Sequence, residues 1–251
     1  MDQDRRLTRR QTIVIAGAAG AGYLLAGPGG VLDHLHDPDD EALAKAAGKC
    51  LRLTPEQEEG PFYVNVNMIR RDIRESSQGV PLTLRIRVID VKTCRPIRHA
   101  AVDIWQANAA GVYSDEASEN TVGQTYLRGI QFTNKKGFAT FRTIYPGHYQ
   151  GRTTHIHVKV HIASKRGAGG ISGGHVAHTG QIFFDDDVTT RVYDADSVYD
   201  GSTSSRVLNS SDQVYTRQGG SRALLSLKGD PSSGFTGTIV LGVNPKATPA
   251  A

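Results

Sequence analysis

The stretch that decides the fold lies past the middle of the chain and reads His155-Ile156-His157-Val158-Lys159-Val160-His161-Ile162. Apolar and polar side chains alternate along it, and this period of two is typical of a β-strand. Residues two apart on a strand point to the same face and lie about 6.5 to 7 Å apart. His155 and His157 are therefore predicted to project together, close enough for one metal ion to bind to both.

A turn precedes this strand at Pro146-Gly147, and a phenol (Tyr149) and a guanidinium (Arg152) follow the turn. Two imidazoles, a phenol and a fixed cation thus fall within residues 149–157, which favours a metal site with a charge-stabilising neighbour. The alternative is a solvated polar strand face, because the chain has nine histidines and one such pair can arise by chance.

Similar patterns predict further strands over residues 82–90, 101–107, 126–133, 137–144, 181–184, 223–228 and 236–243. Residues 163–180 are predicted to be a loop, because their glycines leave little to pack. Asp185–Asp187 is interpreted as a solvated strand end, and one helical turn is expected near 189–193. Many short strands without a long helix predict an all-β fold, a single antiparallel β-sandwich with long loops and few short helices.

Composition bounds the class of protein. The chain has 251 residues, enough for one domain with a sizeable core, and its 22% charged and 38% hydrophobic residues are ordinary for a soluble protein. Its net charge is +4, and residues 1–30 carry +2 of it. Because the remaining Lys and Arg are scattered without a basic stripe, we expect no nucleic-acid partner.

The N-terminus is similar to an export signal. Residues 8–14, Thr-Arg-Arg-Gln-Thr-Ile-Val, resemble a twin-arginine motif, and a mild apolar run follows over 13–26. The run is too short and too weakly apolar to predict a stable membrane anchor. We expect a signal peptide over 1–30, a linker over 31–52 and the β-sandwich domain over 53–245, in a secreted, periplasmic or cell-envelope protein. The alternative is an amphipathic or disordered N-terminus.

The chain has two cysteines, Cys50 and Cys94. In an exported protein they predict one disulfide bridge, and the alternative is a pair of buried free thiols.

Three motifs together resemble one enzyme family: Leu127-Arg128-Gly129, the turn 143–149 (Thr-Ile-Tyr-Pro-Gly-His-Tyr), and 152–157 (Arg-Thr-Thr-His-Ile-His). They are similar to the intradiol ring-cleavage dioxygenases, which include protocatechuate 3,4-dioxygenase and catechol 1,2-dioxygenase. Segments 53–63 and 102–108 also resemble this family, so the similarity covers roughly residues 53–185. The tyrosine followed by Arg-x-x-His-x-His is its most specific part.

The resemblance implies a mononuclear non-haem iron(III) cofactor, whose four ligands correspond to Tyr113, Tyr149, His155 and His157. It also places the family's active-site arginine at Arg152 and its glutamine near the substrate at Gln181. This chain departs from the pattern in two places. The loop 163–180 is longer, and the segment from Tyr149 to Arg152 is shorter, which alters the lining of the pocket.

The chemistry of these residue types agrees with that implication. Phenolate is a hard anionic donor that suits iron(III) better than zinc, whereas imidazole suits both. A bound metal lowers the pKa of tyrosine, which is near 10 in water, so that it can ligate as phenolate. The resemblance implies that a catechol binds through both oxygens, that Tyr149 takes up one of its protons, and that O₂ cleaves the ring between the hydroxyl-bearing carbons to a muconate-type diacid.

Arg152 is expected to stabilise negative charge on the ring, and its alternative role is an ordinary surface ion pair. The expected partners of the protein are a catechol and O₂, with a homo-oligomer possible. Two other functions compete with the dioxygenase. A non-catalytic secreted binding module has no need for all four metal donors, and a zinc hydrolase would require a carboxylate base beside the histidines.

The other histidines are expected to matter less. His148, beside Tyr149, is predicted to line the mouth of the pocket, and His161 to lie beyond the ligands. His175 and His178 are predicted to lie in the solvent-exposed loop, and Trp105 to pack in the core.

Overall fold

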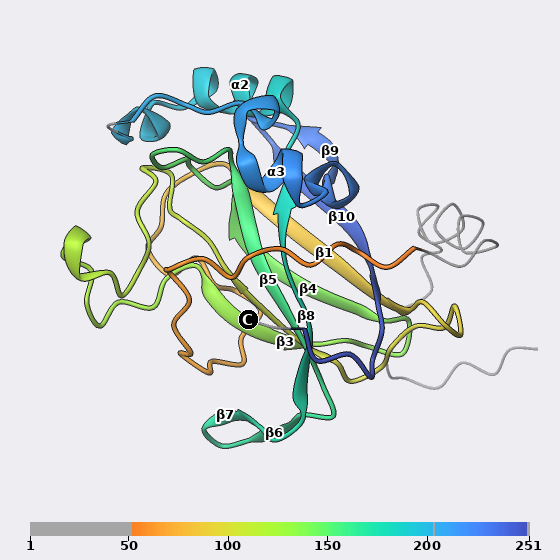
Figure 1. The fold of residues 1–251 in the computed structure, drawn as a ribbon. Coiled ribbons are helices and arrows are strands. Elements are labelled where there is room, and N and C mark those ends of the chain that lie inside the picture. The colour runs from red at the N-terminus through yellow and green to blue at the C-terminus, as the bar shows by residue number, and fades with distance from the viewer. Residues whose placement is uncertain (1–51, 203, 250–251) are drawn as a thin grey trace, which may run out of the picture. The chain divides into compact units, whose positions relative to one another are not determined.

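The structure is a computed structural model that describes residues 52–202 and 204–249, and ten strands and two α-helices form its regular part (Figure 1). The strands are β1 (Pro81–Asp90), β2 (Ala101–Trp105), β3 (Arg128–Phe132), β4 (Phe138–Ile144), β5 (His155–Ile162), β6 (Lys165–Gly167), β7 (Gly170–Ser172), β8 (His175–Phe183), β9 (Ser226–Asp230) and β10 (Gly234–Val243). The α-helices are α2 (Asp186–Ala195) and α3 (Gln213–Arg217), and short 3₁₀ turns occur at η1 (Ala117–Glu119), η2 (Ser197–Gly201), η3 (Asn209–Ser211) and η4 (Gly220–Ala223).

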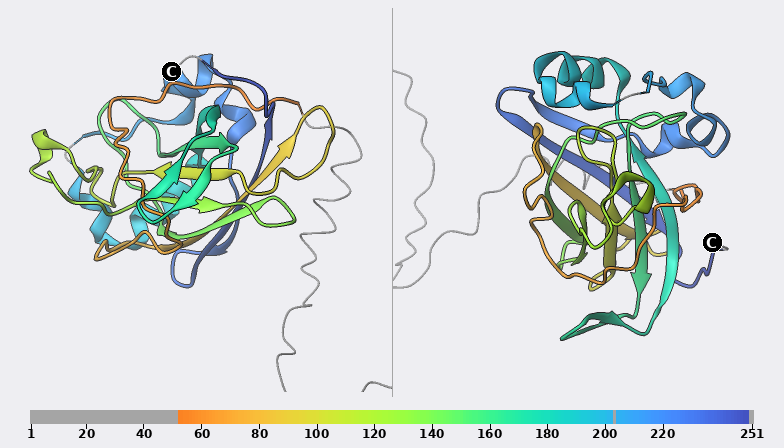
Figure 2. Two further views of the ribbon diagram at one scale, coloured as in Figure 1. Left: turned by 90° about the horizontal axis from the view of Figure 1, so that it is seen from below. Right: turned by 90° about the vertical axis from the view of Figure 1, so that its left-hand side faces the viewer.

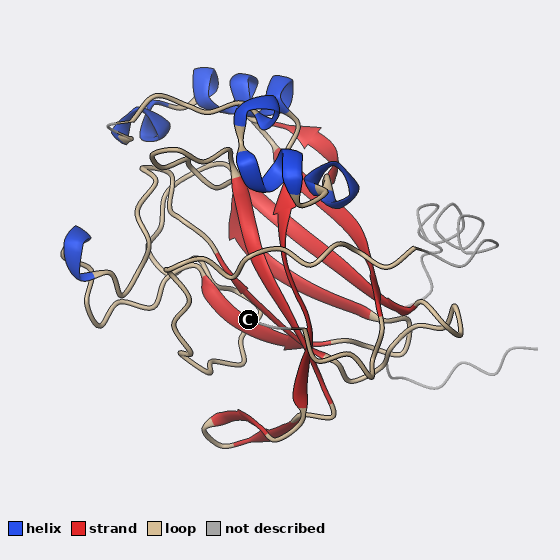
Figure 3. Cartoon of the chain, viewed as in Figure 1, coloured by secondary structure: helices blue, strands red, loops and turns tan. Residues whose placement is uncertain are grey.

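Two four-stranded sheets build the sandwich, in the orders β4-β1-β10-β9 and β3-β2-β5-β8, and β6 and β7 form a separate hairpin. The predicted all-β sandwich with few helices is confirmed (Figure 3). Neighbouring strands run antiparallel, except that β1 and β10 pair in parallel from Leu82 opposite Phe235 to Asp90 opposite Val243. The first sheet is therefore mixed.

The core lies between the two sheets. Along β1 the buried residues alternate with partly exposed ones, so one face of the strand points inward. These inward residues belong to the same apolar cluster as Ile156, Val158 and Val160 of β5. Burying each such side chain contributes about 1.5–3 kcal/mol, which holds the sheets face to face.

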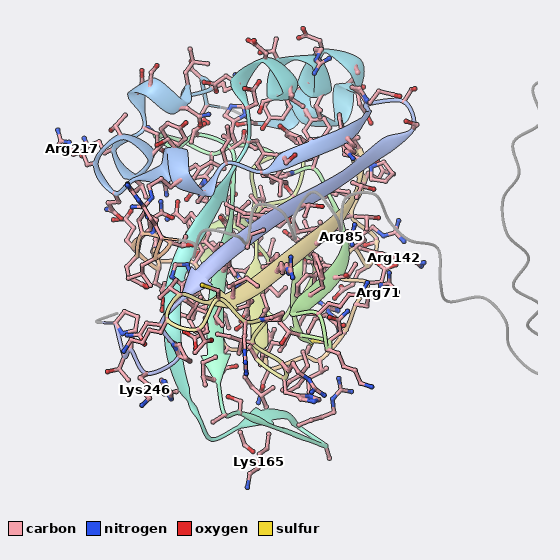
Figure 4. The ribbon with its side chains drawn as sticks, turned by 90° about the vertical axis from the view of Figure 1, so that its right-hand side faces the viewer. Arg71, Arg85, Arg142, Lys165, Arg217 and Lys246 are labelled. Atoms are coloured by element: carbon pink, nitrogen blue, oxygen red, sulfur yellow. The ribbon has the colours of Figure 1, made fainter. Side chains whose placement is uncertain are left out.

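The outer faces of the two sheets differ. On the first sheet, Arg85 and Arg142 lie on the outward side of β1 and β4, and Figure 4 shows them close to Arg71. On the second sheet, His155 and His157 must point outward because Ile156 and Val158 point inward, yet both histidines are buried. Loops cover this outer face, and they turn it into an enclosed site.

The region 163–180, predicted as a loop, was assigned wrongly. It contains β6, β7 and most of β8, and β8 pairs with β5 along its length. This strand is formed by backbone hydrogen bonds to β5 and not by an alternation of apolar residues. Glycine is required at one of its positions and directly before it, because a side chain would collide with neighbouring atoms. A Cβ at Gly180 would lie 2.8 Å from His178 Nε2, and Gly174 takes a positive φ of 73° where the chain turns back.

The helical content was also underestimated. The acidic triplet begins α2 instead of ending a strand, because the Asp185 carboxylate accepts hydrogen bonds from the backbone N–H groups of Asp187 and Val188. The helix then runs for ten residues. The helix α3 was not predicted at all, and it begins at a similar cap, Asp212.

The helices α2 and α3 lie at one end of the sandwich, and the β6–β7 hairpin extends from the opposite end (Figure 1 and the right-hand view of Figure 2). No helix in the part of the chain that the structure describes is long and apolar enough to span a membrane. The predicted signal peptide, nearly all of the predicted linker and Cys50 fall outside the described residues. Cys94 is disulfide-bonded.

Candidate metal centre

His155 is held as a neutral ring whose Nε2 carries no hydrogen. Its Nδ1 lies 2.6 Å from the carbonyl oxygen of Thr153, and a carbonyl can only accept, so Nδ1 carries the hydrogen. Burial, and then the nearby charge of Arg152, lower the pKa of His155 to about 3. At neutral pH its Nε2 therefore presents a lone pair.

His157 faces His155 across a short gap. The two Nε2 atoms are 3.0 Å apart. Because His155 Nε2 carries no hydrogen, either His157 Nε2 donates its hydrogen to it, or both lone pairs face one cation. Burial, and then His155, lower the pKa of His157, which excludes two charged rings. Trp105 stacks on His157, with ring centroids 4.8 Å apart and planes 7° apart, and this contact fixes the imidazole.

Both predicted tyrosines lie beside this pair. Tyr149 Oη is 3.2 Å from His155 Nε2, and the Tyr113 ring centroid is 5.6 Å from that of Tyr149 and 6.2 Å from that of His157. The Tyr113 hydroxyl is buried, with the residue only 2% exposed, and it has no hydrogen-bond partner among the described residues. A buried hydroxyl without a partner is costly, and it indicates a group that completes the site.

Burial raises the pKa of both tyrosines, and the charge of Arg152 opposes that effect. Without a cation they are neutral phenols, and a bound metal would deprotonate them. The donor set is two imidazole nitrogens and two phenol oxygens. Among residues 52–202 and 204–249 no three His, Cys, Asp or Glu side chains are grouped to hold a metal. The set fits a hard trivalent ion such as iron(III) better than zinc.

Arg152 sits at the edge of this cluster and is mostly buried. Its Nε donates to Asp212 Oδ2 at 2.8 Å, its Nη2 to Gln181 Oε1 at 2.5 Å, and its Nη1 to Tyr149 Oη at 3.4 Å. The Arg152 and Asp212 side chains are 15% and 0% exposed, so this ion pair is not the surface pair that the alternative described. The guanidinium instead points at the phenol.

Gln181 lies within β8, the strand that includes the end of the predicted loop. It lies opposite His157 in the β5–β8 register, and its Nε2 donates to the Glu58 carbonyl oxygen at 3.0 Å. Its backbone N–H donates to Gln57 Oε1 at 2.6 Å. Residues 57 and 58 thereby hold Gln181 in the position where its Oε1 accepts the hydrogen bond from Arg152.

The loop that carries Tyr113 is held by Arg128. Its Nε donates to Ser114 Oγ at 2.9 Å, its Nη2 to the Ser114 carbonyl at 2.7 Å, and its Nη1 to the Phe62 carbonyl at 2.8 Å. Phe62 in turn stacks on the Tyr113 ring, with centroids 4.5 Å apart. One buried arginine thus fixes both segments that cover the site.

A cavity of about 850 Å³ opens in front of these side chains. Tyr113, Tyr149 and Arg152 line it, whereas the two histidines lie behind them and are not part of the lining. His148 lines it too, as the sequence predicted.

Sequence reasoning missed Asp212 and misplaced His178. Asp212 lies 60 positions after Arg152 and also accepts from Thr153 N–H at 2.9 Å. The sequence signal that could have identified Asp212 is its position as an acidic N-cap directly before the short helix α3. His178, predicted to be exposed, is buried against Glu56, with Nδ1 2.8 Å from Oε1. Trp105 is buried, as predicted, in a second hydrophobic cluster together with Ala107 and Tyr113.

Comparison with known proteins identifies relatives. A family profile described as "Dioxygenase" matches residues 58–214. The solved structure of an intradiol ring-cleavage dioxygenase from Tetranychus urticae is 34% identical, with a TM-score of 0.69, and the match covers 79% of this chain and 98% of that one. The dioxygenase domain of a dioxygenase carbohydrate-binding protein fusion from Streptomyces sp. SirexAA-E is 30% identical, with a TM-score of 0.54, over 76% of this chain and 99% of that one.

Among curated proteins, catechol 1,2-dioxygenase of Acinetobacter baylyi is 32% identical over 130 residues. The match spans 50% of this chain and 41% of the length of that relative.

Proposed function

Because the chain belongs to the intradiol ring-cleavage dioxygenase family, we propose that it is a mononuclear non-haem iron(III) enzyme. In this proposal it cleaves catechol rings between the two hydroxyl-bearing carbons, adds both atoms of O₂, and releases muconate-type diacids. The observation that carries the proposal is the meeting of two imidazoles and two phenols beside a buried arginine at one cavity.

Four atoms would hold the metal: Nε2 of His155, Nε2 of His157, and the phenolic oxygens of Tyr113 and Tyr149. Bound iron(III) supplies a charge that stabilises a doubly deprotonated catechol and draws electron density from it. The protein prepares the site by keeping both histidines neutral and by leaving the Tyr113 oxygen without another partner.

Tyr149 is the proton acceptor in this mechanism. A catechol that binds through both oxygens must lose two protons: the Tyr149 phenolate can accept one of them at Oη, and the other can leave to solvent through the cavity. Arg152 donates to the same oxygen, at 3.4 Å, and so it can hold Tyr149 in either protonation state. Tyr149 lines the cavity, and Oη is therefore within reach of a ligand there.

Arg152 is assigned to the charge that develops on the ring. A preorganised cation in a water-poor site stabilises such charge without rearrangement during the reaction. Asp212 and Gln181 fix the guanidinium from two sides. These contacts position the cation before substrate binds.

A visible absorption spectrum tests the proposal. Iron-loaded wild-type protein should show a broad tyrosinate-to-iron(III) band that shifts when catechol is added under nitrogen. Tyr113→Phe and Tyr149→Phe should each weaken or remove the band, whereas Tyr199→Phe, a buried tyrosine away from the site, should keep it. A wild-type protein that stays colourless after anaerobic iron(II) loading and reoxidation would contradict the dioxygenase and favour the secreted binding module.

We also propose export through the twin-arginine route, on the basis of Arg9 and Arg10 and the apolar run after them. Cell fractionation of the wild type and of a variant with Arg9→Lys and Arg10→Lys tests this. Retention of both proteins in the same compartment would contradict it.

A further inference from the structure

The outer face of the first sheet collects positive charge. The strands β4, β1, β10 and β9 contain four Lys or Arg residues, and all of them point away from the core: Arg85, Arg87, Arg142 and Lys228. They point outward because their neighbours along each strand, such as Ile86, Phe141 and Leu227, pack in the core between the sheets. The fold thus brings together cations that the sequence spreads over positions 85–228.

The strand register places these cations among hydroxyl side chains. Two neighbouring rows run across the four strands, and both mix the two kinds of side chain: Arg142, Thr83, Thr236 and Lys228, and then Thr140, Arg85, Thr238 and Ser226. Three strand spacings make each row about 14 Å wide. The first row is open to a partner, since Arg142, Thr236 and Lys228 are exposed.

Carboxylates do not neutralise this face. The four strands contain two acidic residues, Asp90 and Asp230, and each is the last residue of its strand. Asp90 Oδ2 accepts from Thr93 Oγ1 at 2.9 Å, and Asp230 Oδ1 accepts from Ser232 Oγ at 2.6 Å. Both acids therefore make hydrogen bonds within the turns that follow their strands.

An aromatic ring and a further cation complete the face. The guanidinium carbons of Arg85 and Arg87 lie 4.9 and 5.4 Å from the centroid of the Phe138 ring, which orients the cations and leaves their charge in place. The Arg71 carbonyl accepts from Arg142 N–H at 2.8 Å, and Figure 4 shows Arg71, Arg85 and Arg142 close together. We refer to Arg71, the outward cations of the four strands and the hydroxyls between them as the basic face.

Charge and hydroxyl groups together indicate the class of partner. Several exposed cations attract anionic groups, and a surface of this width suits a polymer with repeated anions better than one small anion. The Thr and Ser hydroxyls can both donate to sugar hydroxyls and accept from them.

Two other polyanionic partners fit less well. A membrane surface is bound with the help of inserted apolar side chains, and single-stranded nucleic acid with the help of exposed aromatic rings. Among the described residues, the exposed large hydrophobic side chains all lie outside these four strands, and Phe138 is only 6% exposed.

We propose that the basic face binds a linear acidic polysaccharide whose sugar units carry carboxylates. His155 and His157 point outward from the other sheet, so a polymer on the basic face leaves the candidate metal centre accessible. The interaction adds a partner to the protein and does not depend on the proposed function.

Binding of polygalacturonate oligomers tests this, and the fully methyl-esterified oligomers are the matched neutral polymer. Fluorescence anisotropy of end-labelled oligomers gives the dissociation constants. The acidic oligomer should bind and the neutral oligomer should not, and binding should weaken as salt is raised, because salt screens exposed charges.

Variants assign the binding to this face. A double variant with Arg71→Gln and Arg142→Gln should bind about 2- to 30-fold more weakly, because each exposed ion pair contributes modestly. A double variant with Lys165→Gln and Lys246→Gln loses the same charge at positions that lie apart from the basic face in Figure 4. It should bind like the wild type.

Three outcomes overturn the inference: equal binding of the acidic and the neutral oligomers, equal loss of binding in the two double variants, or tighter binding at the same salt to double-stranded DNA or to phosphatidylserine vesicles. None of these measurements requires turnover of a catechol. Failure of this inference is therefore distinguishable from failure of the proposed function.

Discussion

Two pairs of buried tyrosines, Tyr145 with Tyr199 and Tyr113 with Tyr149, are built differently. In the first group, Tyr145 Oη lies 2.7 Å from Thr189 Oγ1, and Tyr199 Oη donates to the Tyr145 carbonyl at 2.9 Å. In the second group, Tyr113 Oη has no partner among the described residues, and Tyr149 Oη meets a histidine and an arginine.

Burial does not distinguish these groups, because it raises the pKa of all four phenols. What differs is the partner of the hydroxyl. Tyr145 and Tyr199 satisfy their hydroxyls within the fold, as buried structural tyrosines do. Tyr149 Oη contacts the imidazole of His155, and both Tyr113 and Tyr149 line the cavity. The comparison teaches that the surroundings of the hydroxyl, and not its burial, distinguish the tyrosines of the candidate metal centre.

Removing either phenol of the second group should have the largest effect. We expect Tyr149→Phe and Tyr113→Phe to lower kcat/KM by about 10³-fold or more, since each removes a ligand and Tyr149 also accepts a proton. Steady-state O₂ uptake with catechol, normalised to bound iron, measures the effect. Activity within 10-fold of wild type in both variants would contradict the assignment of Tyr113 and Tyr149 to the metal centre.

Arg152 tests whether the second group needs its cation. Arg152→Ala should lower kcat by about 10²-fold while the visible band and its shift with catechol remain, because the metal donors are intact. Single-turnover kinetics after anaerobic binding separate the two effects. Unchanged turnover would remove Arg152 from the mechanism, and loss of the band would make it a support of the metal centre.

Tyr63 differs from both groups, because its hydroxyl donates a hydrogen bond to a carboxylate, Asp103 Oδ2, at 3.2 Å. Burial is the main reason that the pKa of Asp103 is raised to about 7, above the value of 3.8 expected when unfolded. The folded protein therefore keeps a proton that the unfolded chain loses, and stability should fall as pH rises from about 4 to about 7. Near Asp103, Lys159 and Arg128 favour the charged carboxylate, and Glu59 opposes it.

Asp103→Asn should abolish this dependence. We expect the wild type to lose about 4 kcal/mol of unfolding free energy from this group between pH 4 and pH 8. Urea unfolding of both proteins across that range measures it, and parallel curves would contradict the prediction.

Tyr199→Phe should have the smallest effect on function and a measurable effect on stability. The hydroxyl accepts from Val80 N–H at 2.9 Å and donates to the Tyr145 carbonyl, so its loss leaves two buried backbone groups unpaired. We expect a loss of about 1–3 kcal/mol, with activity at 25 °C within twofold of wild type. Urea unfolding and O₂ uptake check the two parts. A loss of the iron band in this variant would contradict the assignment of Tyr199 to a purely structural role.

Much of the fold was predictable from local pattern. Alternation along 82–90 and 155–162 gave both strands closely, because an apolar face must meet the core. Only the end of β8 was predicted, in the strand expected over 181–184, since its residues up to Gly180 are held by pairing with β5 and by tight space. The caps at Asp185 and Asp212 escaped it too, because an acidic residue before a weakly apolar segment has several interpretations.

For the candidate site, sequence by itself determined that His155 and His157 share a strand face and that Tyr149 and Arg152 stand just before them, since these relations depend only on the period of a strand and the length of a turn. Only the tertiary structure decided that this face is buried, that Tyr113 reaches it under the hold of Arg128, and that Asp212 and Gln181 orient Arg152. Those contacts join segments dozens of residues apart. Their geometry follows from how the loops close over the sheet, which local pattern does not encode.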